Sequence, residues 1–114
     1  MCVTIIYYSI HLGYYIYTEA SSPRKIGDKA RLISPQYLPK SNGQECVTFW
    51  FHMHGANIGS LNVYIRQSQQ SDKLVWTMRG NEPDLWYYAT IQVNATQLYQ
   101  VNTYLIYDTM LLYR

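Results

Sequence analysis

Residues 46–66 constrain the fold of this chain more than any other stretch. Apolar residues recur there with a period of two, which places them on one face of an extended strand. They are Val47, Phe49, Phe51 and Met53 in the first half, and Leu61, Val63 and Ile65 in the second. A connection that contains Gly and Asn separates the halves, and this pattern predicts a β-hairpin. Neither half contains proline, so both strands are expected inside a sheet rather than at its edge.

Other short segments rich in β-branched and aromatic residues also favour strands, and clusters of Gly, Pro, Asn and Ser separate them. These expected strands are residues 3–8, 13–18, 30–34, 73–79 and 89–93. The last stretch, residues 99–114, is rich in Tyr and Leu and fits either a strand or a helix.

Two of these segments indicate which side chains face the core. Leu74, Trp76 and Met78 are expected to share one face of the first segment. In the second, which Trp86 opens, the inward residues are Ala89, Ile91 and Val93. A chain of 114 residues has room for one domain. Roughly six or seven short strands must cover each other's apolar faces, so an all-β, antiparallel β-sandwich is predicted.

Charge and motifs exclude several classes of function. The net charge is only +2 and the basic residues are scattered along the sequence, so no nucleic-acid partner is predicted. Residues 1–10 lack a basic region and a cleavage site, and no apolar run is long enough to span a bilayer, so we expect neither a signal peptide nor a transmembrane segment in this chain. The sequence lacks hydrolase motifs, a phosphate-binding glycine loop and suitably spaced carboxylates. We therefore expect that the protein is not an enzyme and binds no cofactor.

A set of residues in the first half of the chain stands in a specific order and spacing. They are Gly13, Tyr15, Ile16, Ala20, Leu32, Leu38, Cys46, Val47, Phe51 and Gly55. The phrases GYYIYTEASSP, GDKARLISP, CVTFWFHMHG and GSLNVYIR belong to the same pattern, and so do residues 75–76 and 86–91. In these features the chain resembles the MAM domain, an extracellular module of meprins, neuropilins and receptor tyrosine phosphatases. The resemblance implies a jelly-roll sandwich, an extracellular setting, and a role in adhesion or assembly rather than catalysis.

The resemblance covers the middle of the chain and leaves both ends outside it. A complete MAM domain begins with a segment that carries two cysteines and several acidic residues, and it finishes with a strand resembling GDIAIDDI and a last cysteine. None of these has a counterpart here. We therefore expect residues 1–12 to be a non-family extension, residues 13–101 a partial MAM-like domain, and residues 102–114 a non-family tail. In this interpretation the chain is truncated at both ends and its jelly roll is incomplete at both termini.

Three residues are candidates for covalent modification. Cys2 and Cys46 have neither a metal-ligand spacing nor a CxxC spacing, and a disulfide between them is one alternative. The resemblance implies another, because the cysteine at the position of Cys46 pairs in MAM domains with the last cysteine, so that Cys46 lacks its usual partner. Asn94, followed by Ala95 and Thr96, forms the only N-glycosylation sequon and is the predicted glycosylation site.

Two pairs of polar residues could suggest chemistry. His52 and His54 lie two residues apart and share a strand face, where two imidazoles can ligate zinc. No third ligand can be placed beside them from the sequence, so packed or surface histidines are predicted rather than a metal site. Glu82 and Asp84 flank a proline and are expected to be turn residues rather than a general acid and base.

The three tryptophans, Trp50, Trp76 and Trp86, fit two roles. They fill the sandwich, which is the interpretation we favour, or they form an aromatic platform on which a sugar ring stacks. Trp50 points away from Phe49 and Phe51 by the same alternation, so that side of the strand is expected to cover a loop or a partner.

The resemblance therefore implies a non-catalytic extracellular module that binds a protein partner, with a second copy of itself as one alternative. Its role would be cell adhesion or homo-oligomerisation of a larger membrane or secreted protein, at the cell surface or outside the cell, with membrane contact only through that parent protein. Thirteen tyrosines against two phenylalanines, and a charged fraction of only 14%, support an interacting surface. Two alternatives stay open, namely a lectin-like sandwich that binds carbohydrate through its tryptophans and a non-functional fragment.

Overall fold

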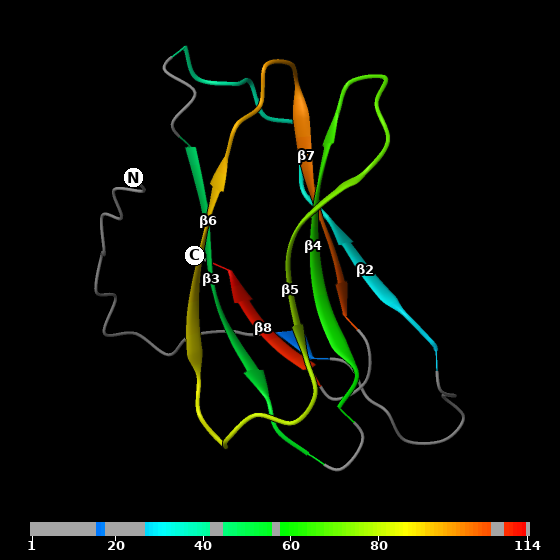
Figure 1. Cartoon of the computed structure of the whole chain (residues 1–114), viewed down its shortest axis with the longest axis vertical. Helices are drawn as coiled ribbons and strands as arrows, with labels where there is room; N and C mark the ends of the chain where they lie inside the picture. The colour runs from blue at the N-terminus through cyan, green and yellow to red at the C-terminus, as the bar shows by residue number, and fades with distance from the viewer. Residues whose placement is uncertain (1–15, 18–26, 42–44, 56–57, 106–108, 114) are drawn as a thin grey trace.

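The computed structural model describes residues 16–17, 27–41, 45–55, 58–105 and 109–113 of the chain. Within these ranges the chain forms eight β-strands and no helix (Figure 1). The strands are β1 (Ile16–Tyr17), β2 (Ala30–Ile33), β3 (Glu45–Met53), β4 (Ser60–Gln67), β5 (Lys73–Arg79), β6 (Tyr87–Val93), β7 (Tyr99–Leu105) and β8 (Thr109–Tyr113). This part of the chain accordingly contains no helix that could cross a membrane.

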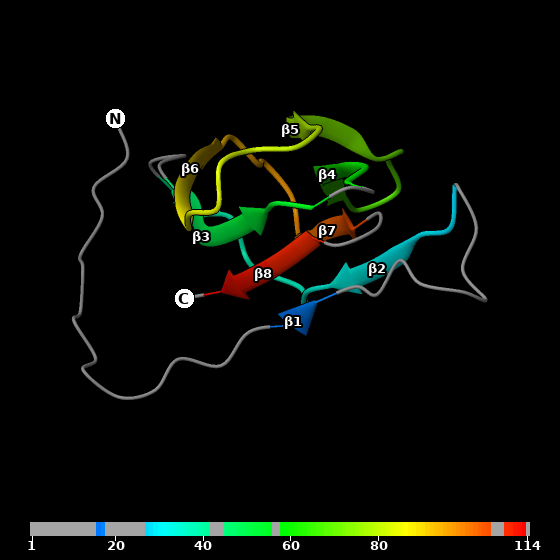
Figure 2. The same ribbon diagram turned by 90° about the horizontal axis from the view of Figure 1, so that it is seen from below.

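The strands form two antiparallel four-stranded sheets that pack face to face (Figure 2). Sheet A has the strand order β1-β8-β3-β6, and sheet B has the order β2-β7-β4-β5. The two alternating strands of residues 46–66 are β3 and β4. Each lies inside its sheet, as predicted from the absence of proline in both strands. The fold is thus the predicted all-β sandwich of jelly-roll type.

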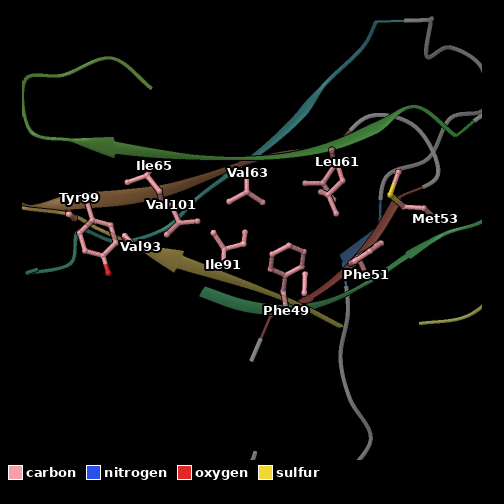
Figure 3. Packing of buried hydrophobic residues seen from close by; sticks show 13 residues of the cluster. Phe49, Phe51, Met53, Leu61, Val63, Ile65, Ile91, Val93, Tyr99 and Val101 are labelled. Atoms are coloured by element: carbon pink, nitrogen blue, oxygen red, sulfur yellow. The ribbon is translucent and has the colours of Figure 1, made fainter. Parts of the chain in front are cut away.

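The hydrophobic core lies between the two sheets and is built from their inward-facing side chains (Figure 3). Figure 3 shows residues of β3 and β6 pointing toward residues of β4 and β7 across the gap. The alternation predicted for residues 46–66 and 89–93 is confirmed, since its apolar residues are buried or pack against the core. Full burial of each such side chain contributes about 1.5–3 kcal/mol. The buried hydrophobic residues are Phe49, Phe51, Met53, Leu61, Val63, Ile65, Ala89, Ile91, Val93, Ala95, Tyr99, Val101 and Leu105.

The predicted hairpin between the two halves of residues 46–66 is wrong. β3 pairs with β6 and β8, whereas β4 pairs with β5 and β7. The connection between β3 and β4 crosses from sheet A to sheet B, so the apolar faces of the two strands cover each other. Alternation shows which face of a strand is buried, but it does not show which strand lies beside it. The hairpin lies one connection later, where residues 68–72 join β4 to β5.

The expectation that Leu74 shares the face of Trp76 and Met78 is also wrong. The register of the β4–β5 pair shifts, so that Val63 lies opposite Trp76 but Tyr64 lies opposite Leu74. This irregularity acts as a β-bulge, which turns the strand and re-aims its side chains. Leu74 is 49% exposed as a result, while Trp76 and Met78 pack against the core as predicted.

The ambiguous C-terminal stretch forms strands rather than a helix. β7 lies between β2 and β4 in sheet B, and β8 lies between β1 and β3 in sheet A. The strands predicted at residues 30–34, 73–79 and 89–93 are confirmed as β2, β5 and β6. Of residues 13–18, β1 is the described part, and the predicted strand at residues 3–8 lies outside the described residues.

Candidate interaction surface on sheet A

The outer face of sheet A carries the side chains of β3 and β6 that point away from the core. In β3, Trp50 and His52 alternate with the buried Phe49 and Phe51. The outer residues of β6 are all exposed to solvent, and they are Tyr88, Thr90 and Gln92. We call the surface formed by Trp50, His52, Trp86 and Tyr88 the aromatic face.

Trp50 and Tyr88 form the centre of the aromatic face. They lie directly opposite each other in the β3–β6 pair. Their ring centroids are 5.1 Å apart and their planes are tilted by 50°. Aromatic pairs of this kind stabilise adjacent strands. Tyr88 nevertheless remains 39% exposed, so its ring also contributes to the molecular surface.

The three tryptophans divide between the core and this surface. Trp76 meets the rings of Phe49 and Phe51 edge-on, with centroids 5.1 Å away in both cases. Trp86 directly precedes β6, is 38% exposed, and has its ring centroid 5.5 Å from that of His52. One tryptophan therefore fills the sandwich, and the other two lie on the outer face of sheet A.

His52 and His54 both contact the connection between β5 and β6. Nε2 of His52 lies 2.7 Å from Oδ1 of Asp84, and Nδ1 of His54 lies 2.9 Å from the carbonyl oxygen of Glu82. The hydrogen bond with His52 lowers the pKa of Asp84, because it stabilises the carboxylate. In the part of the chain that the structure describes, no group of three or more His, Cys, Asp or Glu side chains is arranged to hold a metal ion.

The connection between β5 and β6, residues 80–86, is attached to the end of β3. The backbone amide of Glu82 donates to the carbonyl oxygen of Met53 at 2.7 Å. The amide of Gly55 donates to Oδ1 of Asn81 at 3.0 Å. Gly80 begins the connection with a φ of 82°, which glycine adopts without strain. Glu82 and Asp84 both lie in this connection, and Trp86 at its end lies beside His52.

The candidate residues for modification lie at the start of β3 and after β6. Cys46 is disulfide-bonded, and Cys2 lies outside the described residues. The implication that Cys46 lacks the partner usual in the family stays a prediction. Asn94 is exposed, and Thr96 of the same sequon contacts Oε1 of Gln67 through its amide at 3.0 Å and its hydroxyl at 3.3 Å. Glycosylation of Asn94 also stays a prediction.

Two features of the structure were not singled out from the sequence. Tyr88 is one, although extending the alternation of residues 89–93 by one position would have placed it on the outer face. The other is the pair of Tyr99 and Glu45, in which the hydroxyl donates to Oε2 at 2.7 Å and joins β7 to β3. A pocket of about 570 Å³ lies beside this pair. No local pattern could show this contact, because it joins residues far apart in the sequence.

Similar proteins were found by sequence. The family model "MAM domain, meprin/A5/mu" matches residues 7–108. The chain is 44% identical over 91 residues to the MAM domain-containing glycosylphosphatidylinositol anchor protein 1 of Gallus gallus. This match covers 78% of the present chain and 10% of the Gallus gallus protein. Identity to the Homo sapiens protein of the same name is 37%, and the match covers 78% of this chain and 9% of that protein. Identity to the MAM domain-containing protein 2 of Homo sapiens is 37%, and the match covers 79% of this chain and 13% of that protein. The chain thus spans about a tenth of the length of these relatives.

Proposed function

Since this chain belongs to the MAM domain family, we propose that it is a non-catalytic extracellular module that binds a protein partner through its aromatic face. The relatives named as glycosylphosphatidylinositol anchor proteins support a place at the cell surface, as part of a longer parent protein. Membrane contact would then belong to the parent protein rather than to this domain.

The observation that carries the proposal is the composition of the aromatic face. Trp86 and Tyr88 are 38% and 39% exposed, and the neighbouring Leu85 is 59% exposed. The strands β3 and β6 contain no Lys or Arg. Exposed aromatic residues combined with few charges are typical of the centre of protein interfaces, where Trp and Tyr contribute much of the binding energy.

A second copy of the chain is the partner we propose, which corresponds to adhesion or homo-oligomerisation. A two-fold interface brings the same patch of both molecules together, so it requires a surface that is complementary to itself. The aromatic face contains no lysine or arginine, so two copies of it can approach each other without repulsion between cations.

Sedimentation velocity of the purified chain over a range of concentrations tests the proposal. We expect the weight-average mass to rise with concentration, and we expect the variants Trp86→Ala and Tyr88→Ser to remain monomeric. Leu74→Ser is the matched control, since it removes an exposed apolar side chain from sheet B. A chain that stays monomeric up to near-millimolar concentration would refute self-association, and equal loss in the control would refute the role of the aromatic face.

Carbohydrate binding is the second candidate for the same surface. Two exposed residues in the β5–β6 connection support this candidate. The ring of Trp86 is 38% exposed, and the side chain of Asp84 is 74% exposed, so its carboxylate is able to accept hydrogen bonds from sugar hydroxyls. Neutral oligosaccharides that quench tryptophan fluorescence, with the effect abolished in Trp86→Ala, would favour this candidate. Absence of binding across a broad glycan array would eliminate it.

A further inference from the structure

The cations of this chain are distributed unevenly between the two sheets. The strands of sheet A contain no Lys or Arg, whereas those of sheet B contain Arg31, Arg66, Lys73 and Arg79. Lys29 directly precedes β2. These residues are scattered along the sequence, and the fold gathers them on sheet B. Sheet B packs against sheet A, whose outer side carries the aromatic face (Figure 2).

The register of sheet B places several of its polar side chains in one row. Arg31 lies opposite Tyr104, Tyr104 opposite Asn62, and Asn62 opposite Thr77, across β2, β7, β4 and β5. Their chain neighbours Leu32, Leu61, Thr103 and Met78 are buried or pack against the core, so the row itself faces outward. With strands spaced by about 4.8 Å, the row is about 14 Å long. Arg79 lies two positions beyond Thr77 on the same side of β5.

Tyr104 holds two cations close together on this surface. Nζ of Lys29 is 6.0 Å from the centroid of its ring, and the guanidinium carbon of Arg31 is 5.9 Å from it. Nη1 of Arg31 donates to the Tyr104 hydroxyl at 3.5 Å. Tyr64 supports the ring edge-on, with the centroids 5.2 Å apart. We call the surface formed by Lys29, Arg31, Tyr64, Arg79 and Tyr104 the basic face.

The charge of the basic face is not cancelled by ion pairs at its two arginines. Within the described ranges, neither Arg31 nor Arg79 forms an ion pair with a carboxylate. Arg66 differs, because its Nε is paired with Oδ1 of Asp72, and it is therefore left out of the basic face. Positive charge on the remaining residues attracts anions that carry several charges.

We propose that the basic face binds a linear sulfated polysaccharide. Sulfate groups repeated along a chain complement cations that are spread across neighbouring strands, and they accept charge-assisted hydrogen bonds from guanidinium groups. The hydroxyl of Tyr104 and the side-chain amide of Asn62 lie in the same row and supply hydrogen-bonding groups for the sugar units between sulfates. The choice of a sulfated polysaccharide over a nucleic acid rests on the proposed extracellular setting.

Binding of the 114-residue chain to immobilised heparin, followed by surface plasmon resonance at rising salt concentration, tests this site. We expect binding that weakens as salt screens the charges. The double variant Lys29→Gln, Arg31→Gln should weaken binding by about tenfold, and Arg79→Gln by about threefold. The control Lys40→Gln removes one positive charge, as Arg79→Gln does, but between β2 and β3 and outside the basic face. It should change binding by less than about twofold. Thermal unfolding of each variant verifies that it is folded.

Three results would overturn the proposal. Equal weakening by Lys40→Gln would show attraction by net charge alone. Equal binding to hyaluronan, which carries carboxylates but no sulfates, would remove the requirement for sulfate. Binding to phosphatidylserine vesicles without binding to heparin would assign the face to a membrane instead. Trp86→Ala, which tests the aromatic face, is expected to keep heparin binding, so that the two proposals fail independently.

Discussion

Tyr99 joins the two sheets through a side-chain hydrogen bond. It is 5% exposed in β7, and its hydroxyl donates to the carboxylate of Glu45 in β3 at 2.7 Å. We expect Tyr99→Phe to lower the free energy of unfolding by about 1.5–3 kcal/mol at pH 7, because a bond to a charged acceptor is lost. Urea denaturation measures this. Tyr37→Phe is the control, since that ring is 45% exposed and packs on Tyr99 with centroids 5.7 Å apart, and it should change stability by less than about 0.5 kcal/mol.

The same tyrosine gives the protein a dependence on alkaline pH. Burial, and then the hydrogen bond to Glu45, raise the pKa of Tyr99 above its ordinary value of 10.0. The folded state therefore holds this proton more tightly than the unfolded chain. The resulting stabilisation is complete below pH 10 and is lost as the pH rises above it. Wild-type protein should lose stability above pH 10 more steeply than Tyr99→Phe, and parallel curves would contradict this assignment.

Asn94 tests whether the exposed sequon of this domain accepts a glycan when the chain is secreted. Asn94 is exposed and lies directly after β6. We expect protein expressed with a secretion signal in mammalian cells to carry a glycan, which a glycosidase removes with a drop in mass. Asn94→Gln and Thr96→Ala should both remove the mass difference, whereas Gln92→Ala should keep it. A wild-type mass equal to that of the bare chain would contradict the prediction.

At the scale of elements, Asn81 contributes one of the four hydrogen bonds described above that attach the β5–β6 connection to residues 52–55. Asn81→Ala removes the acceptor for the amide of Gly55, while the other three contacts remain. We expect faster hydrogen exchange at Gly55 and a change in the fluorescence of Trp86. Global stability should fall by only about 1 kcal/mol, because the bond is exposed to solvent. Unchanged exchange at Gly55 would show that Asn81 does not hold the connection, and Gln92→Ala serves as the control.

The buried faces of β3, β4 and β6 could be predicted from the sequence, but the exposure of Leu74 in β5 and the neighbours of the strands could not. Phe49 and Ile91 are buried as their alternation indicated, because period two depends only on adjacent residues. The pairing of β3 with β6 rather than β4 depends on how the sheets cover each other, which no local pattern contains. The candidate site shows the same limit. Trp50 was placed outward correctly, yet its contact with Tyr88 follows from the β3–β6 register alone.

At the scale of the whole molecule, the chain crosses between the sheets at almost every connection. Of the described strands, only β4 and β5 are consecutive members of one sheet. Strands that pair are therefore far apart in the sequence, as in the contact of Ala30 with Leu105. Such a topology delays the closure of its contacts, so folding in milliseconds to seconds is expected. The inner apolar face of each sheet is covered by the other sheet, so the two sheets share one core.

This shared core leads to a prediction about how the molecule unfolds. Leu61 in β4 is 0% exposed, and Leu61→Ala should lower the free energy of unfolding by about 2–5 kcal/mol. Because β4 of sheet B packs against sheet A, the loss should appear equally in the hydrogen exchange of Phe49 in β3 and Val101 in β7. Leu74→Ala, at an exposed leucine of β5, is the control and should cost about 0.5 kcal/mol or less. If exchange accelerates in β7 while β3 keeps its protection, the sheets unfold separately and the single-core account fails.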